Sequence, residues 1–408
     1  MRTLIITPHP PFPAQQGAAL RNLGLLHCLK LFGAQVTLLT FSDSDSLPDE
    51  APARLADLCE QVIYAPAPPR SMPQRLRDLL LTREPDLARR LDSSEFVRRL
   101  TDLLQSRGFD LVQFEGLETA SYAPIVRRIQ PTARIVYDAH NAEFALQRSM
   151  ARVESLSLWR LPAALYSRTQ ARRITQFERA VCERADAVIA VSQDDAEHLS
   201  SLETSTPIHT LPNGIFADDY MAGGNHLELS GIPLVFTGKM DYRPNVDAIQ
   251  WFAEAIFGDI LTQHSEAKLY VVGQAVHGNL LVLQQSNPRI AFTGWVESVK
   301  PFLHHATVFV APLRMGSGTR LKILEAMAAG CAIVATTVAI SGLEDAVRDA
   351  LIVADTAQGF SSAVSQLIGD SGARQRLSVA ARRYACERYD WSILAPRLRQ
   401  IYAGLGVG

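Results

Sequence analysis

One stretch in the second half of the chain, residues 307–330, constrains the fold most strongly. Residues 307–312 (TVFVAP) are apolar and β-branched over the length of a buried strand. We expect a helix to begin near Thr319. Gly316 and Gly318 carry no side chains at the corner between the two elements, so backbone N–H groups can approach a ligand there. Because the first four N–H groups of a helix have no partner inside it, this corner favours an anion such as phosphate.

The predicted helix carries two ionisable side chains on one face. Lys322 and Glu325 are three residues apart, beside an apolar stripe that includes Leu321. At about 1.5 Å per residue, Glu325 lies roughly 9 Å along the axis from Thr319, which is about one sugar beyond a diphosphate. A carboxylate at that distance can accept hydrogen bonds from ribose hydroxyls. A glycine-capped helix with a surface Lys–Glu pair would explain the same residues without a ligand.

The composition is that of a globular protein with two domains. The chain has 408 residues, too many for one compact core. Hydrophobic residues make up 47% and the formal net charge is −2, so no overall attraction to nucleic acid is expected. The uncharged apolar runs are far shorter than the roughly 18 residues of a membrane span, and no signal peptide is predicted at the N-terminus. Five scattered cysteines without a CxxC motif are typical of reduced thiols in a cytoplasm.

The N-terminus predicts a strand–helix–strand unit. Residues 4–7 and 36–40 are typical of short buried strands, with a helix from about residue 18 to 32 between them. The loop before this helix holds four prolines and ends at Gly17. Such loops are often plain connections, so Gly17, His9 and Arg21 are open to a structural as well as a functional interpretation.

Polar side chains follow two further predicted strands, at residues 111–114 and 134–137. Asp138, His140 and Glu143 come directly after the second of them. In open α/β sheets the carboxyl ends of strands line the ligand crevice, so these side chains are placed for a substrate. An isolated histidine is usually structural. At this position the pattern favours function for His140, with Asp138 and Glu143 able to orient it.

Two arginine-rich regions are predicted to be helical. In residues 43–110, prolines separate segments whose arginines and leucines recur at helical spacing, and residues 145–184 predict a long helical stretch. A solvated amphipathic face is the simpler interpretation. The alternative is a patch that contacts anionic lipid head groups. A strand is then expected at residues 187–191, followed by a helix that begins at Ser192.

The second half of the chain repeats the alternation of strands and helices after a turn at residues 212–214 (PNG). A loop that carries Lys239, Arg243 and Asn245 precedes a helix predicted from residue 246 to about 257. The strands predicted in this half, besides residues 307–312, are residues 234–237, 269–272, 289–292 and 332–336.

No metal site is predicted. His304 and His305 are adjacent, so on a helix they point about 100° apart, and no third ligand accompanies them. The triplet Asp43-Ser44-Asp45 lies in a Ser-rich turn, where Asp is common for local hydrogen-bonding reasons.

The glycine-rich stretch resembles the donor-binding motif of the retaining GT-B glycosyltransferases of the family-four type. Residues 325–330 (EAMAAG) match the second half of a family pattern with two glutamates eight residues apart, and Ser317 stands at the position of the first glutamate. The variant GSGTRLK, residues 316–322, is similar to a version found in bacterial cell-surface polysaccharide assembly members. The resemblance covers nearly all of the chain and is strongest from about residue 232 to 345.

The resemblance implies a GT-B fold, an α/β architecture of two Rossmann-like domains facing across a cleft. An N-terminal, acceptor-side domain would comprise residues 1–213, completed by a C-terminal helix at about 390–408 that crosses back onto it. Residues 214–389 would form the donor-binding domain. The implied reaction moves a sugar from a nucleotide diphosphate donor to a hydroxyl acceptor with retention of the anomeric configuration.

The resemblance also implies roles for individual residues. It places His140 beside the transferred sugar. Members of the family neutralise the diphosphate with an arginine and then a lysine. Lys239 occupies the arginine position and Asn245 falls near the lysine position, so Arg320 or Lys322 would supply the missing charge. The other implied donor-binding residues are Gly17, Gly294, Trp295, Val296, Gly316, Ser317, Gly318, Thr319, Leu321 and Glu325.

The implied partners are a nucleotide-sugar donor and a glycan or lipid-linked acceptor, with no cofactor, no metal and no nucleic acid. A hexosyltransferase of this type would lie in the cytoplasm, with peripheral contact at the inner face of the membrane as an alternative. Two other functions remain open. One is a sugar-nucleotide epimerase of the same fold, and the other is a non-catalytic protein that binds nucleotide sugars.

Overall fold

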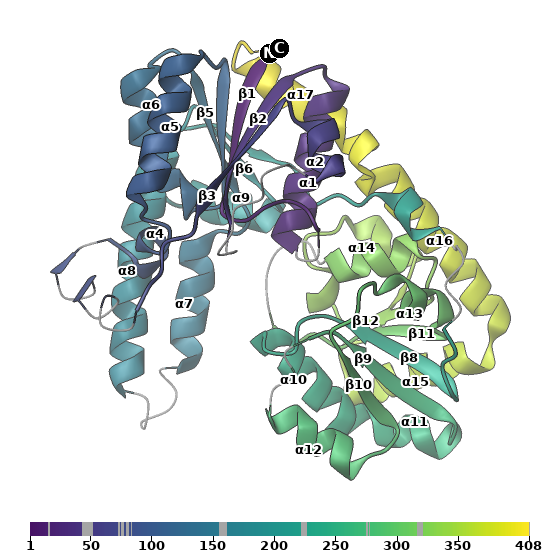
Figure 1. The fold of residues 1–408 in the computed structure, drawn as a ribbon. Helices are drawn as coiled ribbons and strands as arrows, with labels where there is room; N and C mark the ends of the chain where they lie inside the picture. Colours follow the sequence, from purple (N-terminus) through teal and green to yellow (C-terminus); the bar gives the residue numbers. More distant parts are fainter. Residues whose placement is uncertain are drawn as a thin grey trace. The chain divides into compact units, whose positions relative to one another are not determined.

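The chain divides into two compact units (Figure 1). The computed structural model describes residues 1–14, 17–42, 52–71, 74, 77–78, 81–82, 84–154, 161–221, 227–274, 276, 278–315 and 321–407. The first unit comprises Met1–Asn213 and Leu394–Gly408, and the second comprises Gly214–Ile393. Within the part of the chain just given, no helix is long and apolar enough to cross a membrane.

The first unit is built on a seven-stranded sheet in which all neighbouring strands are parallel. Its strands are apolar and mostly buried, as expected for a parallel sheet covered on both faces. They lie in the order β3-β2-β1-β4-β5-β6-β7. Their bounds are β1 (Arg2–Thr7), β2 (Gln35–Ser42), β3 (Gln61–Pro66), β4 (Leu111–Glu115), β5 (Arg134–Ala139), β6 (Ala187–Ala190) and β7 (Ile208–Thr210).

Helices cover both faces of this sheet. Figure 1 shows α5 and α6 on one side and α1 and α17 on the other. Phe96 and Leu100 of α5 pack in one core cluster with Leu4 and Ile6, the alternate residues of β1. Ser93 caps α5 by accepting a hydrogen bond from Phe96 N at 3.2 Å. The helices are α1 (Gly17–Leu31), α2 (Ala53–Leu58), α4 (Asp86–Arg89), α5 (Ser94–Ser106), α6 (Ala123–Ile129), α7 (Glu143–Glu154), α8 (Leu161–Arg184), α9 (Gln193–Ser200) and α17 (Trp391–Gly404).

The second unit repeats the design on a six-stranded parallel sheet. Its order is β10-β9-β8-β11-β12-β13, with β8 (Ile232–Thr237), β9 (Ala267–Val272), β10 (Ile290–Gly294), β11 (Val308–Ala311), β12 (Ile333–Ala335) and β13 (Ile352–Val353). Phe252, Phe257 and Phe360 fill its core, with ring centroids 5.6–6.1 Å apart for the two pairs that involve Phe252. The helices are α10 (Arg243–Trp251), α11 (Phe257–Gln263), α12 (Gly278–Ser286), α13 (Lys300–His305), α14 (Leu321–Ala328), α15 (Ala357–Gly369) and α16 (Ser371–Tyr389).

In each sheet, successive strands are added first toward one edge and then, from the centre, toward the other edge, so the strand order reverses at one place. In the first unit β1 lies between β2 and β4, and in the second β8 lies between β9 and β11. Loops that leave the carboxyl ends of strands at such a reversal diverge to opposite faces, which leaves a crevice where ligands bind in open α/β sheets. Two places in the fold are thereby indicated before any side chain is considered: the ends of β1 and β4, with β5 beside β4, and the ends of β8 and β11.

The predicted strands are confirmed, and three strands were missed. The strand–helix–strand pattern at the N-terminus and the strand at residues 308–311 appear as predicted. β3, β7 and β13 were not predicted. The long helical stretch predicted at residues 145–184 is two helices, α7 and α8, and the helix predicted from residue 246 runs from Arg243 through a π-helical turn at Phe252–Ile256 into α11. The units divide between Asn213 and Gly214, within the predicted turn, and again inside α17.

Candidate active site

A buried ion pair joins α1 to the end of β5 in the first unit. Arg21 Nε and Nη2 each donate to one carboxylate oxygen of Asp138, both at 2.6 Å. Nη1 of Arg21 also donates to Leu211 O and Asn213 Oδ1, both at 3.1 Å, near the boundary of the unit. Arg21 is 1% exposed and Asp138 is fully buried. Burial opposes ionisation of Asp138, but the guanidinium and its hydrogen bonds hold the pKa of the carboxyl below its usual value.

A second buried carboxyl, Glu115, lies at the end of the neighbouring strand. Glu115 on β4 is the register partner of Asp138 on β5, so the two side chains emerge at one edge of the sheet. Gln113 Nε2 donates to Glu115 Oε1 at 2.6 Å. Burial, followed by the negative charge of Asp138, raises the pKa of Glu115 well above its usual range. The surroundings therefore favour the ionised form of Asp138 and disfavour the ionised form of Glu115.

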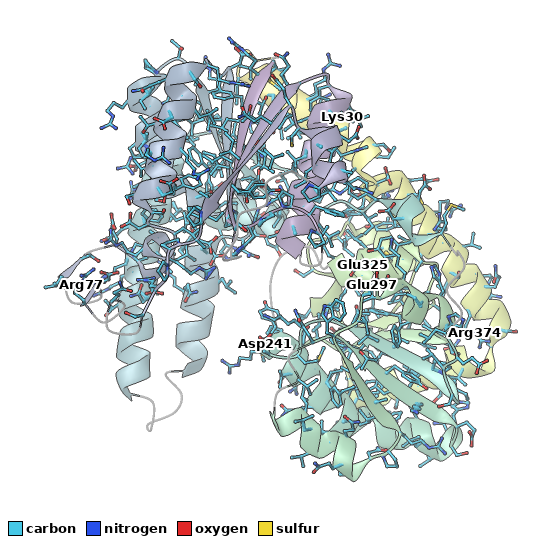
Figure 2. The ribbon with its side chains drawn as sticks, viewed as in Figure 1. Lys30, Arg77, Asp241, Glu297, Glu325 and Arg374 are labelled. Carbon is cyan, nitrogen blue, oxygen red and sulfur yellow. The ribbon has the colours of Figure 1, made fainter. Side chains whose placement is uncertain are left out.

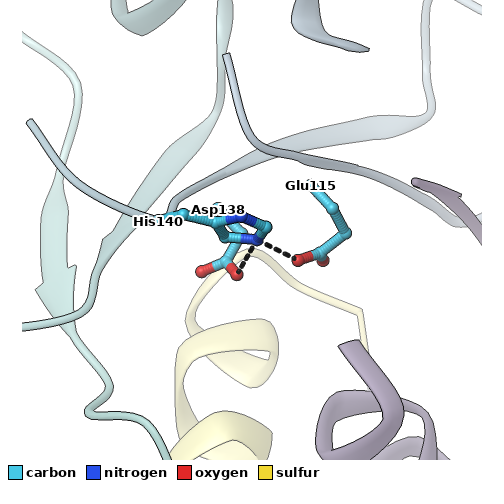
Figure 3. Close-up of side chains that lie close together, drawn as sticks. All are labelled: Glu115, Asp138 and His140. Carbon is cyan, nitrogen blue, oxygen red and sulfur yellow. Dashed lines mark hydrogen bonds and ion pairs between the residues drawn. The ribbon is translucent and has the colours of Figure 1, made fainter. Parts of the chain in front are cut away.

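His140 projects from the loop after β5 against both carboxyl groups (Figure 3). Its Nε2 lies 3.2 Å from Glu115 Oε2 and 3.8 Å from Asp138 Oδ2. The side chain is 17% exposed, so the imidazole spans from the buried carboxyl groups to the surface. Burial lowers the pKa of His140, with the Asp138 charge opposing, and favours the neutral imidazole. Gly116, at φ +78°, packs beside the ring, where an added Cβ would lie 3.6 Å from Nδ1.

The three side chains in Figure 3 also have the composition of a cation site. Among the residues described, Glu115, Asp138 and His140 each offer one ligand atom, and these atoms lie within 4.8 Å of one another. Arg21 already bonds both oxygens of Asp138, and burial raises the pKa of Glu115, which disfavours a second carboxylate charge there. The charge that a cation would supply is thus provided by the guanidinium. That no metal ion is needed at this site therefore stays a prediction.

The helix that follows His140 begins over a further buried carboxyl. Glu178 on α8 accepts from Glu143 N at 3.1 Å and from Phe144 N at 2.8 Å, so it satisfies two unpaired N–H groups at the start of α7. Burial raises the pKa of Glu143 to about 7. Glu143 was expected to orient His140 because it follows closely in the chain. The hydrogen-bonding contact to the imidazole comes instead from Glu115.

The reversal in the second sheet brings together three residues from separate segments. Lys322 Nζ on α14 donates to Asn245 Oδ1 on α10 at 2.7 Å and lies 4.0 Å from the ring centroid of Phe236 on β8. Asn245 Nδ2 donates in turn to Lys239 O at 2.8 Å. Gly238, at φ +149°, packs against this pair, since an added Cβ would lie 2.7 Å from Asn245 Nδ2 and 2.8 Å from Lys322 Nζ.

Glu325 lies one turn further along α14 (Figure 2). It is half-buried, and Tyr220 Oη donates to its Oε1 at 2.7 Å. Lys300 Nζ lies 5.0 Å from the ring centroid of Tyr220. Burial raises the pKa of Glu325, and the Tyr220 hydrogen bond and the Lys322 charge oppose that shift. The carboxyl is thus fixed on the same face as Lys322, as the spacing predicted.

The other predicted residues are more exposed. Lys239 points to solvent, where its Nζ pairs with Asp241 at 3.2 Å; the two side chains are 51% and 49% exposed. Gly294 has φ +69° at the end of β10 and is followed by Trp295, which is 59% exposed. Val296 and Leu321 are half-buried, and Gly17 is exposed at the first residue of α1.

Two family models match the chain, one on each side of the boundary between the units. A model described as a glycosyl transferase 4-like domain matches residues 16–214, and one described as glycosyl transferases group 1 matches residues 232–370. The chain belongs to the GT-B glycosyltransferases. The predicted family and the predicted pair of Rossmann-like domains are thereby confirmed.

Individual proteins also resemble this glycosyltransferase, at sequence identities of 14–26%. A phosphatidyl-myo-inositol mannosyltransferase of Mycobacterium tuberculosis (strain CDC 1551 / Oshkosh) is 26% identical over 258 residues, 58% of this chain and 65% of that one. The chain spans 57–65% of the length of the curated relatives first matched. Sucrose-phosphate synthase from Thermosynechococcus elongatus has a TM-score of 0.70 at 19% identity and covers 99% of both chains. Anabaena HepE, solved with UDP and glucose, has a TM-score of 0.66 at 14% identity, covering 98% of this chain and 99% of that one. Both structures support the fold.

Part of the predicted donor site lies outside the described residues of this GT-B protein. This applies to Gly316, Ser317, Gly318, Thr319 and Arg320, and also to the Asp43-Ser44-Asp45 triplet. The described residues add two partners that sequence reasoning missed. Glu115 contacts His140, and Tyr220 holds Glu325. The position of Glu115 at the end of a predicted strand was the one available signal for its role, whereas no signal pointed to Tyr220.

Proposed function

We propose that the protein transfers a sugar from a nucleotide diphosphate donor to a hydroxyl acceptor. The observation that carries this proposal is the cluster of Gly238, Asn245 and Lys322 where the second sheet reverses its strand order. An ammonium group, an amide and a close-packed backbone at the carboxyl end of a parallel strand suit a diphosphate. Thr237 Oγ1, at the end of β8, is buried without a hydrogen-bond partner among the described residues and is a further polar group for the donor.

The residues of the second unit would share the donor between them. Lys322, with Arg320 and the backbone N–H groups of residues 316–319, would stabilise the charge that builds on the departing diphosphate. Glu325 would accept hydrogen bonds from the ribose, and residues 294–296 would contact the base. The likeness to HepE, solved with UDP and glucose, supports a nucleotide of this kind as the donor. Lys239 is a weaker candidate than Lys322, because it is half exposed and already pairs with Asp241.

His140 is the candidate catalytic residue of the first unit. We expect its imidazole to contact the transferred sugar, with the anomeric configuration retained and with no divalent metal required. The expected acceptor is a growing glycan or a lipid-linked precursor. The match to a phosphatidyl-myo-inositol mannosyltransferase supports the lipid-linked alternative.

A thermal-shift screen tests donor binding directly, because a ligand that binds only the folded protein raises its melting temperature. We expect a UDP, GDP, ADP or TDP sugar to raise the Tm of the wild-type protein, and Lys322→Ala to abolish most of the shift. No shift with any member of the panel would contradict the proposal. Conversion of the sugar without an acceptor would indicate an epimerase instead, and tight donor binding without transfer to any acceptor extract would indicate a binding protein.

A further inference from the structure

A chain of buried hydrogen bonds connects the C-terminal helix to His140. Tyr402 Oη on α17 donates to Gln113 Oε1 at 2.5 Å, and Gln113 Nε2 donates to Glu115 Oε1 at 2.6 Å. Glu115 Oε2 lies 3.2 Å from His140 Nε2. Tyr402, Gln113 and Glu115 are each at most 1% exposed, so water does not compete for these bonds.

The donors and acceptors along this chain follow a fixed direction. The Tyr402 hydroxyl faces the amide oxygen of Gln113 and donates to it, which turns the amide N–H₂ of Gln113 toward Glu115. In the orientation of Asn22 that satisfies both ends of its amide, Nδ2 donates to Glu115 Oε2 at 2.9 Å. Glu115 thus accepts a hydrogen bond at each oxygen.

The surroundings of His140 Nε2 decide which atom of the ring carries the hydrogen. Nε2 faces Glu115 Oε2 and, at 3.8 Å, the Asp138 carboxylate that Arg21 keeps ionised. Two acidic oxygens on one side of the ring favour an N–H at that nitrogen. Nδ1 of the ring lies beside Gly116, where the absence of a side chain leaves space.

We propose that Glu115 is a positioning residue for the transfer reaction, anchored by Tyr402 through Gln113, and that it holds His140 in the tautomer with hydrogen on Nε2. Nδ1 is then unprotonated and accepts a hydrogen bond from a hydroxyl group of the transferred sugar. The inference rests on the proposed function, because the sugar is the partner that it assigns to Nδ1.

The charges around the ring fit a neutral imidazole. Arg21 bonds both oxygens of Asp138 and balances its charge, and burial disfavours a second negative charge on Glu115, whose pKa is raised. Burial lowers the pKa of His140 as well. The titratable and charged groups that act on His140 from the surrounding elements are Asp138, Glu115, Arg21, Glu118 and Glu143.

Histidine side-chain NMR on the full chain tests this inference without a substrate. In protein with ¹⁵N-labelled histidine, the signals of His140 are those lost in His140→Gln. We expect the neutral Nε2–H tautomer at pH 7. Tyr402→Phe removes the hydroxyl that anchors the chain but keeps the buried ring, so we expect the His140 signals to shift and the tautomer population to become mixed.

Tyr122→Phe is the matched control. Tyr122 is a buried tyrosine of the same unit whose hydroxyl donates to Leu91 O, away from His140. Its loss should leave the His140 signals unchanged. An Nδ1–H tautomer in the wild-type protein, or equal shifts in Tyr402→Phe and Tyr122→Phe, would overturn the inference.

Kinetics give the second measurement. Tyr402→Phe and Glu115→Gln should lower kcat by up to about tenfold, the scale of one lost hydrogen bond, with little change in KM for the donor. Glu115→Gln keeps an oxygen for Asn22 and His140 but cannot accept from Gln113. Unchanged kcat and His140 signals in both variants would contradict the inference. If no nucleotide sugar is transferred by the wild type, the proposed function fails, whereas the NMR result still decides the tautomer.

Discussion

The ammonium group of Lys322 has a more defined position than that of Lys239. Asn245 accepts from Lys322 Nζ at 2.7 Å and Phe236 lies beneath it, whereas the Lys239 side chain is 51% exposed. A preorganised charge in a partly dry site contributes more to anion binding than a mobile surface charge. We predict that Lys322→Ala weakens donor binding by about 1–3 kcal/mol. Lys239→Ala is the control with the smaller expected loss. Calorimetry of both variants with the nucleotide donor checks this, and a larger loss in Lys239→Ala would reverse the assignment.

Glu325 is the second residue whose role in donor binding a single substitution can test. Tyr220 occupies one of its oxygens, which leaves acceptor capacity for a ribose. Glu325→Gln should therefore weaken donor binding by about 1–3 kcal/mol, the value of a hydrogen bond to a charged group. The measurement is donor affinity by calorimetry, with Tyr220→Phe as a comparison that removes the support but keeps the carboxylate. Unchanged affinity in Glu325→Gln would exclude the carboxylate from the donor site.

At the scale of elements, the Arg21–Asp138 pair fastens α1 to β5. Both partners are buried, so removing one charge leaves the other uncompensated. We predict that Asp138→Asn lowers the free energy of unfolding by about 3–5 kcal/mol. Asp241→Asn, in the half-exposed pair with Lys239, should change it by less than about 1 kcal/mol. Urea unfolding of both variants measures the difference, and equal stability would mean that the buried pair contributes no more than the surface pair.

The same pair predicts a dependence on pH. The pKa of Asp138 is lower in the folded state than its ordinary value of 3.8. The stability that ionised Asp138 adds to the fold is therefore fully present well above pH 3.8, and it is lost as the pH falls through 3.8 toward the pKa of the folded state. The stability gap between wild type and Asp138→Asn should therefore narrow in acid. A gap that stays constant from pH 6 to pH 3 would show that ionisation of Asp138 does not stabilise the fold.

Strands with an apolar, β-branched sequence were predictable, and strands without that pattern were not. β1 and β11 are continuous buried runs, whereas β7 has three half-buried residues and β3 is partly exposed and ends at Pro66, in a Pro-rich region. The role of Glu115 was not predicted, for another reason. Its contact with His140 depends on the register of β4 against β5, and register is a tertiary property that local sequence does not carry.

At the scale of the whole molecule, the same crevice geometry occurs twice with different chemistry. The first sheet ends in two carboxyl groups and an imidazole, and the second ends in an amide and an ammonium group beside a glycine. Acidic residues with a histidine suit the hydroxyl groups of a sugar, and the basic set suits a diphosphate. Asp138, His140, Gly238, Asn245 and Lys322 could be predicted as neighbours of strand ends from the sequence, because strand ends and residue types are local features, whereas the contact of Glu115 with His140 could not.

Transfer of labelled sugar from UDP, GDP, ADP and TDP donors to glycan and lipid extracts, in excess chelator, tests the central claim most directly. The account predicts acceptor-dependent incorporation of label from one donor class, undiminished by the chelator, because basic side chains and backbone N–H groups take the place of a cation. The His140→Ala variant should no longer transfer the sugar, but its affinity for the free nucleoside diphosphate should be nearly unchanged. Activity that vanishes with chelator and returns with magnesium or manganese would contradict the proposed charge arrangement, and donor binding with no incorporation into any acceptor would contradict the assignment as a transferase.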